Sequence, residues 1–495
     1  MTTYALVDES IVAQTFALRR EAPTPSPVRE GPILTTAWAM GSVIRDSSGL
    51  FRMWYMAPPV YCQYFATSLD GITWEKPTLN LVSPDLGAGP NAFLSVRQRD
   101  ANGRWLVGEV AGPEGFSVLD AEAQPHPAAK ARFTSLYLAW FGENDGMRAA
   151  KGLCLAHSDD GVHWLADEHN PIIPGWHDTS NCLVYDEPIG KYLVFGRPPV
   201  RVGLGRNANM LLSRMESDDL VSWSAPRTIL DTDERDADAF AFTDEIRLRK
   251  ARLDPRDADA RALLEAKAVT PGAAPEIMAR GRNRVFYGMT AFRSGGLHVG
   301  FATLYDVPSG NTWIELVHSR DGLNWIREPL REPYLGPRPG TWESCQVRPT
   351  MATPPVPVKD ELWIYYSASP QSHHAGKAFE GRAIGLRAVK ADRWVAYRSG
   401  DVEAELLTHP IKAGARLWLN ASTASDGWLR VAVCDAWGNA LDGLGHEDCD
   451  PIAGDAIRHE VRWRAGATMP TLPDEVRLRI RSRNASTFAF CLAAE

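Results

Sequence analysis

The chain has 495 residues, of which 44% are hydrophobic, 23% charged and 9% aromatic, and its formal net charge is −8. This composition is typical of a globular protein that is long enough for two or more domains. An acidic chain without a basic stripe argues against nucleic-acid binding, which requires the neutralisation of phosphates. No segment is apolar enough to span a bilayer, and the N-terminus lacks the basic and apolar regions of a signal peptide.

Seven Cys are scattered along the chain without a CxxC pair. An odd number of Cys without metal-ligand spacing predicts reduced thiols in a soluble cytoplasmic protein, and no metal site. Cys434 and Cys449 are the pair that could form a disulfide if the chain were exported.

A seven-residue pattern, Ser-x-Asp-Gly-x-x-Trp, recurs along the first two thirds of the chain. It occupies 68–74, 158–164 and 319–325, and a copy without the Gly occupies 217–223. Each copy follows short runs rich in aromatic and branched residues, which predict strands. The Asp and Gly are expected to close a tight turn with the Trp packed beneath it. The pattern therefore marks repeats of one strand-rich unit and is not itself a functional site.

Each unit consists of three strands, the turn and a short exit strand, which together form a four-stranded antiparallel blade. Blades arranged about one axis leave only short, protected sheet edges, so the repeat predicts a five-bladed β-propeller over 32–400. Residues 1–31 are expected to form an N-terminal lead-in segment. The predicted blades span about 32–85, 86–172, 173–232, 233–332 and 333–398.

Two stretches do not fit this repeat of strands and turns. Residues about 245–283 are predicted to be an insertion in the fourth blade, with a short helix over 257–268. Residues 112–132, rich in Ala and Pro, are predicted to be a loop. Beyond the propeller, residues 401–495 alternate inward and outward positions and have frequent turn signals, which predicts a C-terminal β-sandwich.

A propeller with these turns and an appended sandwich resembles the five-bladed glycoside hydrolases, above all family 32 and its uncharacterised bacterial relatives. The strings over 405–411, 417–420 and 429–438 are similar to the sandwich of those relatives. The resemblance implies an exo-acting hydrolase of a small glycoside or oligosaccharide, with a furanoside (a fructoside or arabinofuranoside) favoured. It implies no cofactor, although some relatives hold Ca²⁺ in the axial channel. It leaves the oligomeric state open.

The sequence departs from the family at the first blade. The family motif Trp-Met-Asn-Asp-Pro-Asn is absent, and Ala39 stands where related proteins carry an acid. This departure favours an alternative function, that of a non-catalytic carbohydrate-binding or interaction propeller. A second alternative is a sialidase-like hydrolase, since the turn also resembles the Asp box of sialidases. The arginine triad of sialidases cannot be assigned from the sequence.

Hydrolysis of a glycosidic bond requires two carboxyl groups that flank the bond. The inner strand of each blade begins at the axial funnel, so the catalytic residues are expected where blades open. Asp178 and Glu343, which open the third and fifth blades, are the first candidates, and Asp238 in the fourth is the next. Structural roles stay open for all three: an Asx turn for Asp178, a salt bridge or cap for Glu343, and a solvated acidic loop for Asp238.

Other residues near the blade openings are candidates to bind the substrate. Indole faces stack on sugar rings, and amide, imidazole or guanidinium groups bind hydroxyls or pair with a carboxylate. The candidates are Trp38, Ala39, Asn91, Trp176, His177, Asn181, Arg197 and Trp342.

Overall fold

The structure is a computed structural model. It describes residues 2–39, 41–59, 62–109, 111–142, 151–175, 177–178, 181–198, 210–233, 236, 284–307, 309–329, 331–349, 354–373, 375, 380–464, 466, 469 and 472–493. Across these residues the regular structure is β-strand, apart from the 3-10 helices Glu9–Ile11, Pro84–Leu86 and Glu187–Ile189. The all-β prediction is therefore confirmed. The predicted helix over 257–268, and the insertion that carries it, lie outside the described residues.

The first three sheets are antiparallel meanders in which consecutive strands pair, except that the last strand of the second sheet pairs with the strand two places before it. The first sheet contains β6 (Val43–Arg45), β7 (Phe51–Met56), β8 (Gln63–Ser68) and β9 (Ala92–Leu94). The second contains β12 (Ala111–Asp120), β13 (Phe133–Trp140), β14 (Lys151–Ser158), β15 (Leu165–Ala166) and β16 (Ile173–Pro174). The third contains β17 (Cys182–Asp186), β18 (Lys191–Gly196), β19 (Leu212–Ser217) and β20 (Arg227–Leu230). The hairpin β10 (Gln98–Arg99) and β11 (Trp105–Val107) lies between the first two.

A ten-stranded sheet follows, and it consists of two meanders joined by one parallel contact, Thr312 to Gln346. The first meander contains β21 (Arg284–Ser294), β22 (Leu297–Asp306), β23 (Asn311–Ser319) and β24 (Ile326–Arg327). The second contains β25 (Gln346–Pro349), β26 (Val356–Val358), β27 (Glu361–Ser369) and β28 (Ala383–Lys390), with β4 (Ser26–Pro27) and β5 (Leu34–Thr35) on its outer edge. Segments from near the N-terminus, β4 and β5, therefore pair with β28 of the last meander.

Each meander packs against the next one through a shared apolar core. Trp54 of the first meander contacts Phe133 of the second, with ring centroids 5.6 Å apart. One core contains residues of the second and third meanders, another those of the third and fourth, and a third those of the fourth and fifth. Phe51 on β7 stacks on Trp363 on β27 at 5.9 Å, so the last meander also packs on the first.

The recurring turns are built from local hydrogen bonds. In the first copy the Ser68 hydroxyl accepts the Gly71 N–H, and Asp70 Oδ1 accepts the N–H groups of Ile72 and Thr73, at 2.7–2.8 Å. The copies at 158–164 and 319–325 have the same bonds. In the copy without Gly, Leu220 adopts the left-handed φ of 67° that Gly provides elsewhere.

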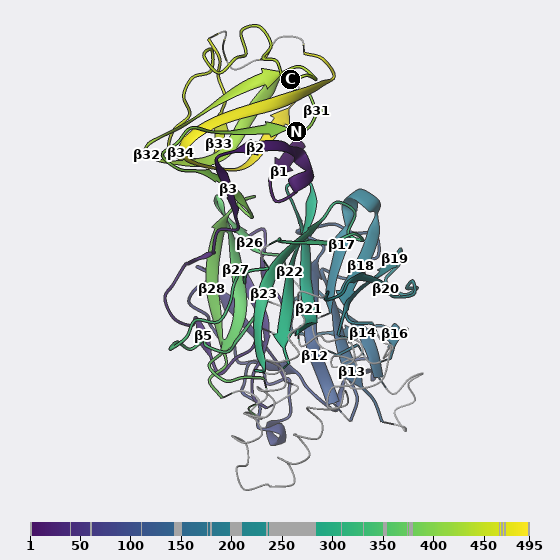
Figure 1. Ribbon diagram of the computed structural model, residues 1–495. Helices are drawn as coiled ribbons and strands as arrows, with labels where there is room; N and C mark the ends of the chain where they lie inside the picture. Colours follow the sequence, from purple (N-terminus) through teal and green to yellow (C-terminus); the bar gives the residue numbers. More distant parts are fainter. Residues whose placement is uncertain are drawn as a thin grey trace, which may run out of the picture.

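The chain ends in a nine-stranded sheet to which its first residues also belong, and Figure 1 shows this sheet at one end of the meanders with both termini nearby. Its N-terminal strands are β1 (Thr2–Ala5), β2 (Val12–Phe16) and β3 (Leu18–Glu21). The others are β29 (Ala396–Ser399), β30 (Ala404–Thr408), β31 (Ile411–Lys412), β32 (Arg416–Cys434), β33 (Asp455–Glu460) and β34 (Glu475–Ala493). Thr2 pairs with Leu492, and Arg19 with Arg398.

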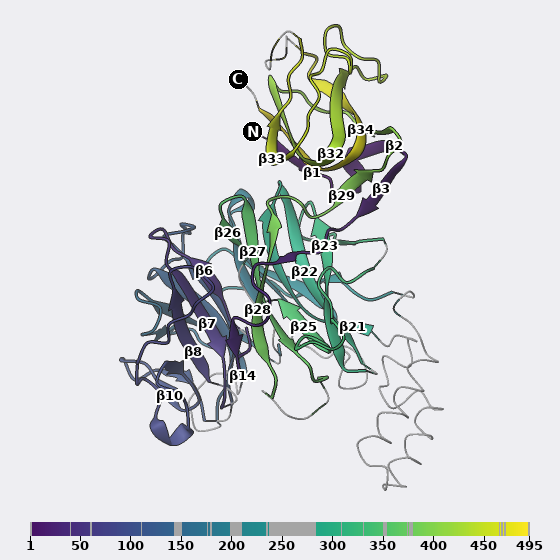
Figure 2. The same ribbon diagram turned by 90° about the vertical axis from the view of Figure 1, so that its left-hand side faces the viewer.

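The turned view in Figure 2 shows the nine-stranded sheet next to one end of the meanders, and apolar and polar side chains join the two. Ala5 and Val7 share a core with Phe292. The Trp394 indole N–H donates to Ser294 Oγ at 2.9 Å, and Arg320 pairs with Asp8 at 2.5 Å. Cys434 at the end of β32 and Cys449 in the segment that follows are both free and buried.

Candidate active site

Glu114 lies on β12, a segment that the sequence predicted to be a loop. That prediction is wrong for 112–120, which belongs to β12 and pairs with β13, with register shifts on both sides of Glu114. Such β-bulges re-aim side chains and are common beside functional sites. Glu114 is half-buried. Burial and the nearby charge of Asp178 raise the pKa of its carboxyl to about 8, while Arg197 acts in the opposite direction. Glu114 is therefore protonated at neutral pH.

Asp178 lies just before the third sheet and has a left-handed backbone, with φ of 53°. The Asn181 side chain stabilises this conformation by donating from Nδ2 to the Asp178 carbonyl at 2.6 Å. Gly196 makes room for Asn181, since a Cβ at that position would collide with Asn181 Oδ1. A non-glycine residue in this region stores strain, which proteins often place at functional sites. Asn181 therefore positions Asp178 and is not placed as a direct substrate ligand.

Arg197, which follows β18, pairs with the Asp178 carboxylate. Its side chain is 1% exposed, whereas that of Asp178 is 26% exposed. A buried guanidinium beside a carboxylate favours the ionised form of the carboxylate. Arg197 and Asp178 therefore form an ion pair, and the charges around Asp178 differ from those around Glu114.

Two further arginines extend the site from Arg197. The Arg197 guanidinium lies 4.9 Å from the Tyr287 ring centroid, and Arg348 lies 4.1 Å from the same ring. Arg348 also lies 5.2 Å from the Trp38 ring, which Arg382 approaches at 3.8 Å. We call this set the arginine–aromatic row: Arg197, Tyr287, Arg348, Trp38 and Arg382.

The site thus draws on four of the meanders and on the segment before the first one. Trp38 precedes β6, Glu114 is on β12, Tyr287 on β21 and Arg348 on β25. Of the predicted residues, the structure brings together Trp38, Asp178, Asn181 and Arg197. Sequence reasoning missed Glu114, Tyr287, Arg348 and Arg382.

Glu343 is buried in a different set of contacts. Its carboxylate accepts hydrogen bonds from Arg338, from Arg387 at 3.1 Å and from the Tyr366 hydroxyl at 2.9 Å. Trp342 stacks on Tyr366 with centroids 5.9 Å apart. In the described part of the chain, the ion pairs of Glu343 do not include a residue of the arginine–aromatic row. These contacts correspond to the salt-bridge role that the sequence left open.

Two predicted residues in or just before the first meander are buried in structural contacts. Asn91 donates both amide hydrogens within the protein, to Tyr55 Oη at 2.9 Å and to the Phe65 carbonyl at 2.8 Å. The Ala39 N–H donates to Ser367 Oγ at 2.6 Å, and its methyl group belongs to an apolar core. A glutamate at position 39 would therefore place the first carbon atoms of its side chain in that core.

His177 is completely buried beside Asp178. Burial lowers the pKa of its imidazole to about 4, and the backbone carbonyls of Pro174, Ile173 and Arg197 oppose this effect. The imidazole is therefore neutral at physiological pH and does not supply a charge to the site. Two other predicted residues, Asp238 and Trp176, lie outside the described residues.

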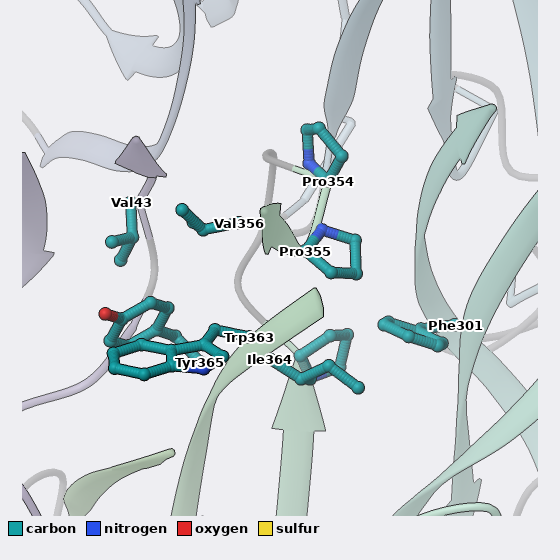
Figure 3. A pocket seen from close by; sticks show the side chains of 9 residues that line it. Val43, Phe301, Pro354, Pro355, Val356, Trp363, Ile364 and Tyr365 are labelled. Atoms are coloured by element: carbon teal, nitrogen blue, oxygen red, sulfur yellow. The ribbon is translucent and has the colours of Figure 1, made fainter. Parts of the chain in front are cut away.

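A pocket elsewhere in the meanders has the character of a packing gap. It is lined by Val43, Phe301, Pro349, Pro354, Pro355, Val356, Trp363, Ile364 and Tyr365, and most of these side chains are seen in Figure 3. Its volume of about 10 Å³ is that of a single water, and its lining is largely apolar. Among the described residues, no cluster of His, Cys, Asp and Glu is placed to hold a metal, and no helix has the length and apolarity to cross a membrane.

The comparisons with known proteins leave the family open. No family model matches the sequence, and no curated protein matches it. Among solved structures, a thermostable family-43 glycoside hydrolase is similar over 75% of this chain and 95% of its own, with 12% identity and a TM-score of 0.44. A glycosyl hydrolase from Bacteroides ovatus is similar over 75% of this chain and 96% of its own, with 12% identity and a TM-score of 0.43.

A third similar structure is an N-acetylgalactosamine deacetylase from F. plautii, solved in complex with blood group B trisaccharide. It covers 75% of this chain and 95% of its own, with 13% identity and a TM-score of 0.40. Identities and TM-scores this low do not carry a function from one protein to another. The function therefore depends on the chemistry of the site.

Proposed function

We propose that the protein is a glycoside hydrolase in which Glu114 is the general acid and Asp178 is the base or nucleophile. The observation that carries the proposal is the opposite electrostatic environment of these two neighbouring carboxyl groups. Burial and the charge of Asp178 raise the pKa of Glu114 to about 8, and the Arg197 guanidinium pairs with Asp178. Glycosidases require one protonated and one ionised carboxyl group, and environments of this kind produce such a pair.

In the proposed reaction, Glu114 donates its proton to the glycosidic oxygen as the bond to the anomeric carbon breaks. Asp178 either attacks the anomeric carbon or removes a proton from the attacking water. Arg197 keeps Asp178 ionised and fixes its position. Trp38, which is 1% exposed, fixes the two guanidinium groups that it contacts.

Several finer features belong to the same proposal. The closed sequence of meander contacts supports a five-bladed β-propeller, and the nine-stranded sheet supports an appended β-sandwich domain. Exo action, a cytoplasmic location and a small carbohydrate partner are proposed with them. The preference for a furanoside comes from the family resemblance alone.

The test is an assay of nitrophenyl furanosides and pyranosides with the wild-type protein and with the variants Glu114→Gln and Asp178→Asn. Loss of general acid catalysis typically costs about 10²–10⁴-fold in rate. We expect Glu114→Gln to lose that much on sugars with poor leaving groups and far less on dinitrophenyl glycosides, whose leaving group needs no proton. Asp178→Asn should be slow on both substrates. If the wild type hydrolyses no member of the panel while sugars still bind, the protein is a binding propeller and the proposal fails.

A further inference from the structure

One face of the nine-stranded sheet carries a row of arginines. Along β34 every second residue belongs to the apolar core, beginning with Val476, Leu478 and Ile480. Successive side chains of a strand point to opposite faces of the sheet. The residues that alternate with these core positions therefore lie on the outer face: Arg477, Arg479, Arg481 and Arg483. The chain as a whole is acidic, with a net charge of −8, so this positive row is a local departure.

The neighbouring strand β32 places another arginine directly opposite one member of this row. Arg430 pairs in register with Arg481, and it lies on the outer face because Leu429 and Val431 belong to the core. Residues opposite each other on antiparallel strands have Cβ atoms about 4.5–5.5 Å apart, and like charges there are destabilising. The two guanidinium groups can therefore reach one anion, and a bound anion would offset their repulsion.

The carboxylates beside these two arginines neutralise them only in part. Glu405 accepts from Arg481 Nε at 3.1 Å and also lies 3.5 Å from Arg479 Nε, so one carboxylate serves two guanidinium groups. Arg430 lies 3.5 Å from Glu447, whose side chain is 83% exposed, and exposed ion pairs contribute little. The side chains of Arg430 and Arg481 are themselves 31% and 42% exposed, so both remain accessible to a ligand.

Both arginines line one cavity of about 350 Å³ on this face. This volume is within the range of small-molecule sites, about 300–1,000 Å³. Trp428 and Glu403 also line the cavity. Trp428 is half-buried and lies on the outer face of β32, and Glu403 is exposed at its rim. The segment that follows β32 forms one wall, where the buried His446 imidazole donates from Nε2 to a carbonyl of β34 at 2.9 Å.

The chemistry of this lining matches a sugar ring that carries a carboxylate. The face of an indole stacks on a sugar ring, and the Glu403 carboxylate can accept hydrogen bonds from sugar hydroxyls. The planar fork of a guanidinium matches the two oxygens of a carboxylate. An acidic peptide would use the two arginines but would leave the indole and the carboxylate without a role.

We propose that this cavity binds an acidic oligosaccharide, with one ring on Trp428 and the carboxylate of that ring between Arg430 and Arg481. The nine-stranded sheet would then hold a glycan chain that bears uronate groups. None of the residues that line this cavity belongs to the candidate active site, so the inference does not depend on Glu114 or Asp178.

The test is calorimetric binding of trigalacturonate and trimannuronate to the full chain, each compared with its fully methyl-esterified form. The ester keeps the sugar rings and removes the charge. We expect at least one acid to bind about 10-fold or more tightly than its ester, the typical effect of a charged hydrogen bond. Triglutamate, which carries carboxylates without sugar rings, should bind more weakly than that acid.

Three variants locate the binding and separate its two components. Arg430→Gln and Arg481→Gln should each remove the preference for acid over ester. Trp428→Ala should weaken acid and ester by a similar factor, because stacking does not depend on the charge. Arg398→Gln is the matched control and should change neither, since this arginine is 61% exposed and pairs with Glu21 elsewhere in the same sheet.

Near-ultraviolet circular dichroism of each variant reports folding, and the two arginine variants supply independent tests if one of them does not fold. Equal binding of acid and ester would overturn the proposal. A preference that persists in a folded Arg430→Gln or Arg481→Gln variant would also overturn it, since the acid would then bind elsewhere. Triglutamate binding as tight as that of the acidic sugar, and unchanged in Trp428→Ala, would make the face a peptide site and contradict the proposal.

Discussion

Glu114 lies in the second sheet and Asp178 just before the third, and the two are electrostatically coupled, since burial and then the charge of Asp178 raise the pKa of the Glu114 carboxyl to about 8. The bulged course of β12 brings Glu114 to this point, and the left-handed backbone of Asp178 brings the second carboxylate. Arg197 lies beside both and pairs with only one of them. One carboxyl group therefore has a raised pKa while the other pairs with a guanidinium, and acid and base catalysis by two carboxyl groups requires environments that differ in this way.

The first prediction concerns the pH dependence of stability in Glu114→Gln. The folded pKa is raised from an ordinary value of 4.5 to about 8, so the folded state binds this proton more tightly than the unfolded state. The resulting stabilisation is complete below about pH 4.5 and is lost as the pH rises through 8. Glutamine does not ionise. The stability of Glu114→Gln relative to that of the wild type should therefore be higher at pH 9 than at pH 5. Urea unfolding midpoints at those two pH values measure this, and a constant difference would contradict it.

The second prediction separates a structural role from a catalytic role for Glu343. Glu343→Gln removes the charge that Arg387 and Arg338 share, and breaking a buried ion pair costs about 3–5 kcal/mol. We expect a large loss in the free energy of unfolding, measured by urea titration, while the folded fraction keeps its kcat. The control is Glu21→Gln, which breaks an exposed pair and should cost about 1 kcal/mol or less. Wild-type stability together with abolished activity would instead make Glu343 catalytic.

The third prediction concerns the recurring turn. Gly161 has φ of 87°, and a Cβ there would lie 2.9 Å from the buried Trp54 ring. Gly190 also has a left-handed φ, of 64°, but a Cβ there would meet nothing within 4 Å. Both alanine variants incur the backbone cost of about 1–2 kcal/mol. Gly161→Ala should lose about 1–3 kcal/mol more through overpacking. Equal losses in the free energy of unfolding, measured by urea titration, would show that Gly161 is not tightly packed against Trp54.

The local part of the fold could be predicted from the sequence, because its causes are local. The Ser, Asp and Gly of each turn make their hydrogen bonds within seven residues, so the pattern predicts the turn wherever it occurs. The short run rich in aromatic and branched residues before the first turn likewise predicted the strand β7. The contact between Phe51 and Trp363 depends on a partner far along the chain, and the sequence alone did not identify it.

The same distinction explains the candidate site. Asp178 precedes and Arg197 follows a recognisable strand, so their positions at the end of a sheet could be predicted. Glu114 lies between Pro113 and Gly115, residues that usually mark a loop, and the bulged strand that carries it depends on pairing with β13. The pairing of Thr2 with Leu492 was missed for the same reason, since strand partners are chosen by the tertiary fold.

The pH dependence of kcat/KM, measured from pH 5 to pH 10 on a hydrolysed nitrophenyl glycoside, tests the central claim most directly. If Glu114 is the general acid, the basic limb should fall with an apparent pKa near 8, and deprotonation of one group should account for it. A dinitrophenyl substrate, whose leaving group needs no proton, should lose this dependence. A kcat/KM that stays constant or rises through pH 8 on the nitrophenyl substrate would contradict the assignment of Glu114.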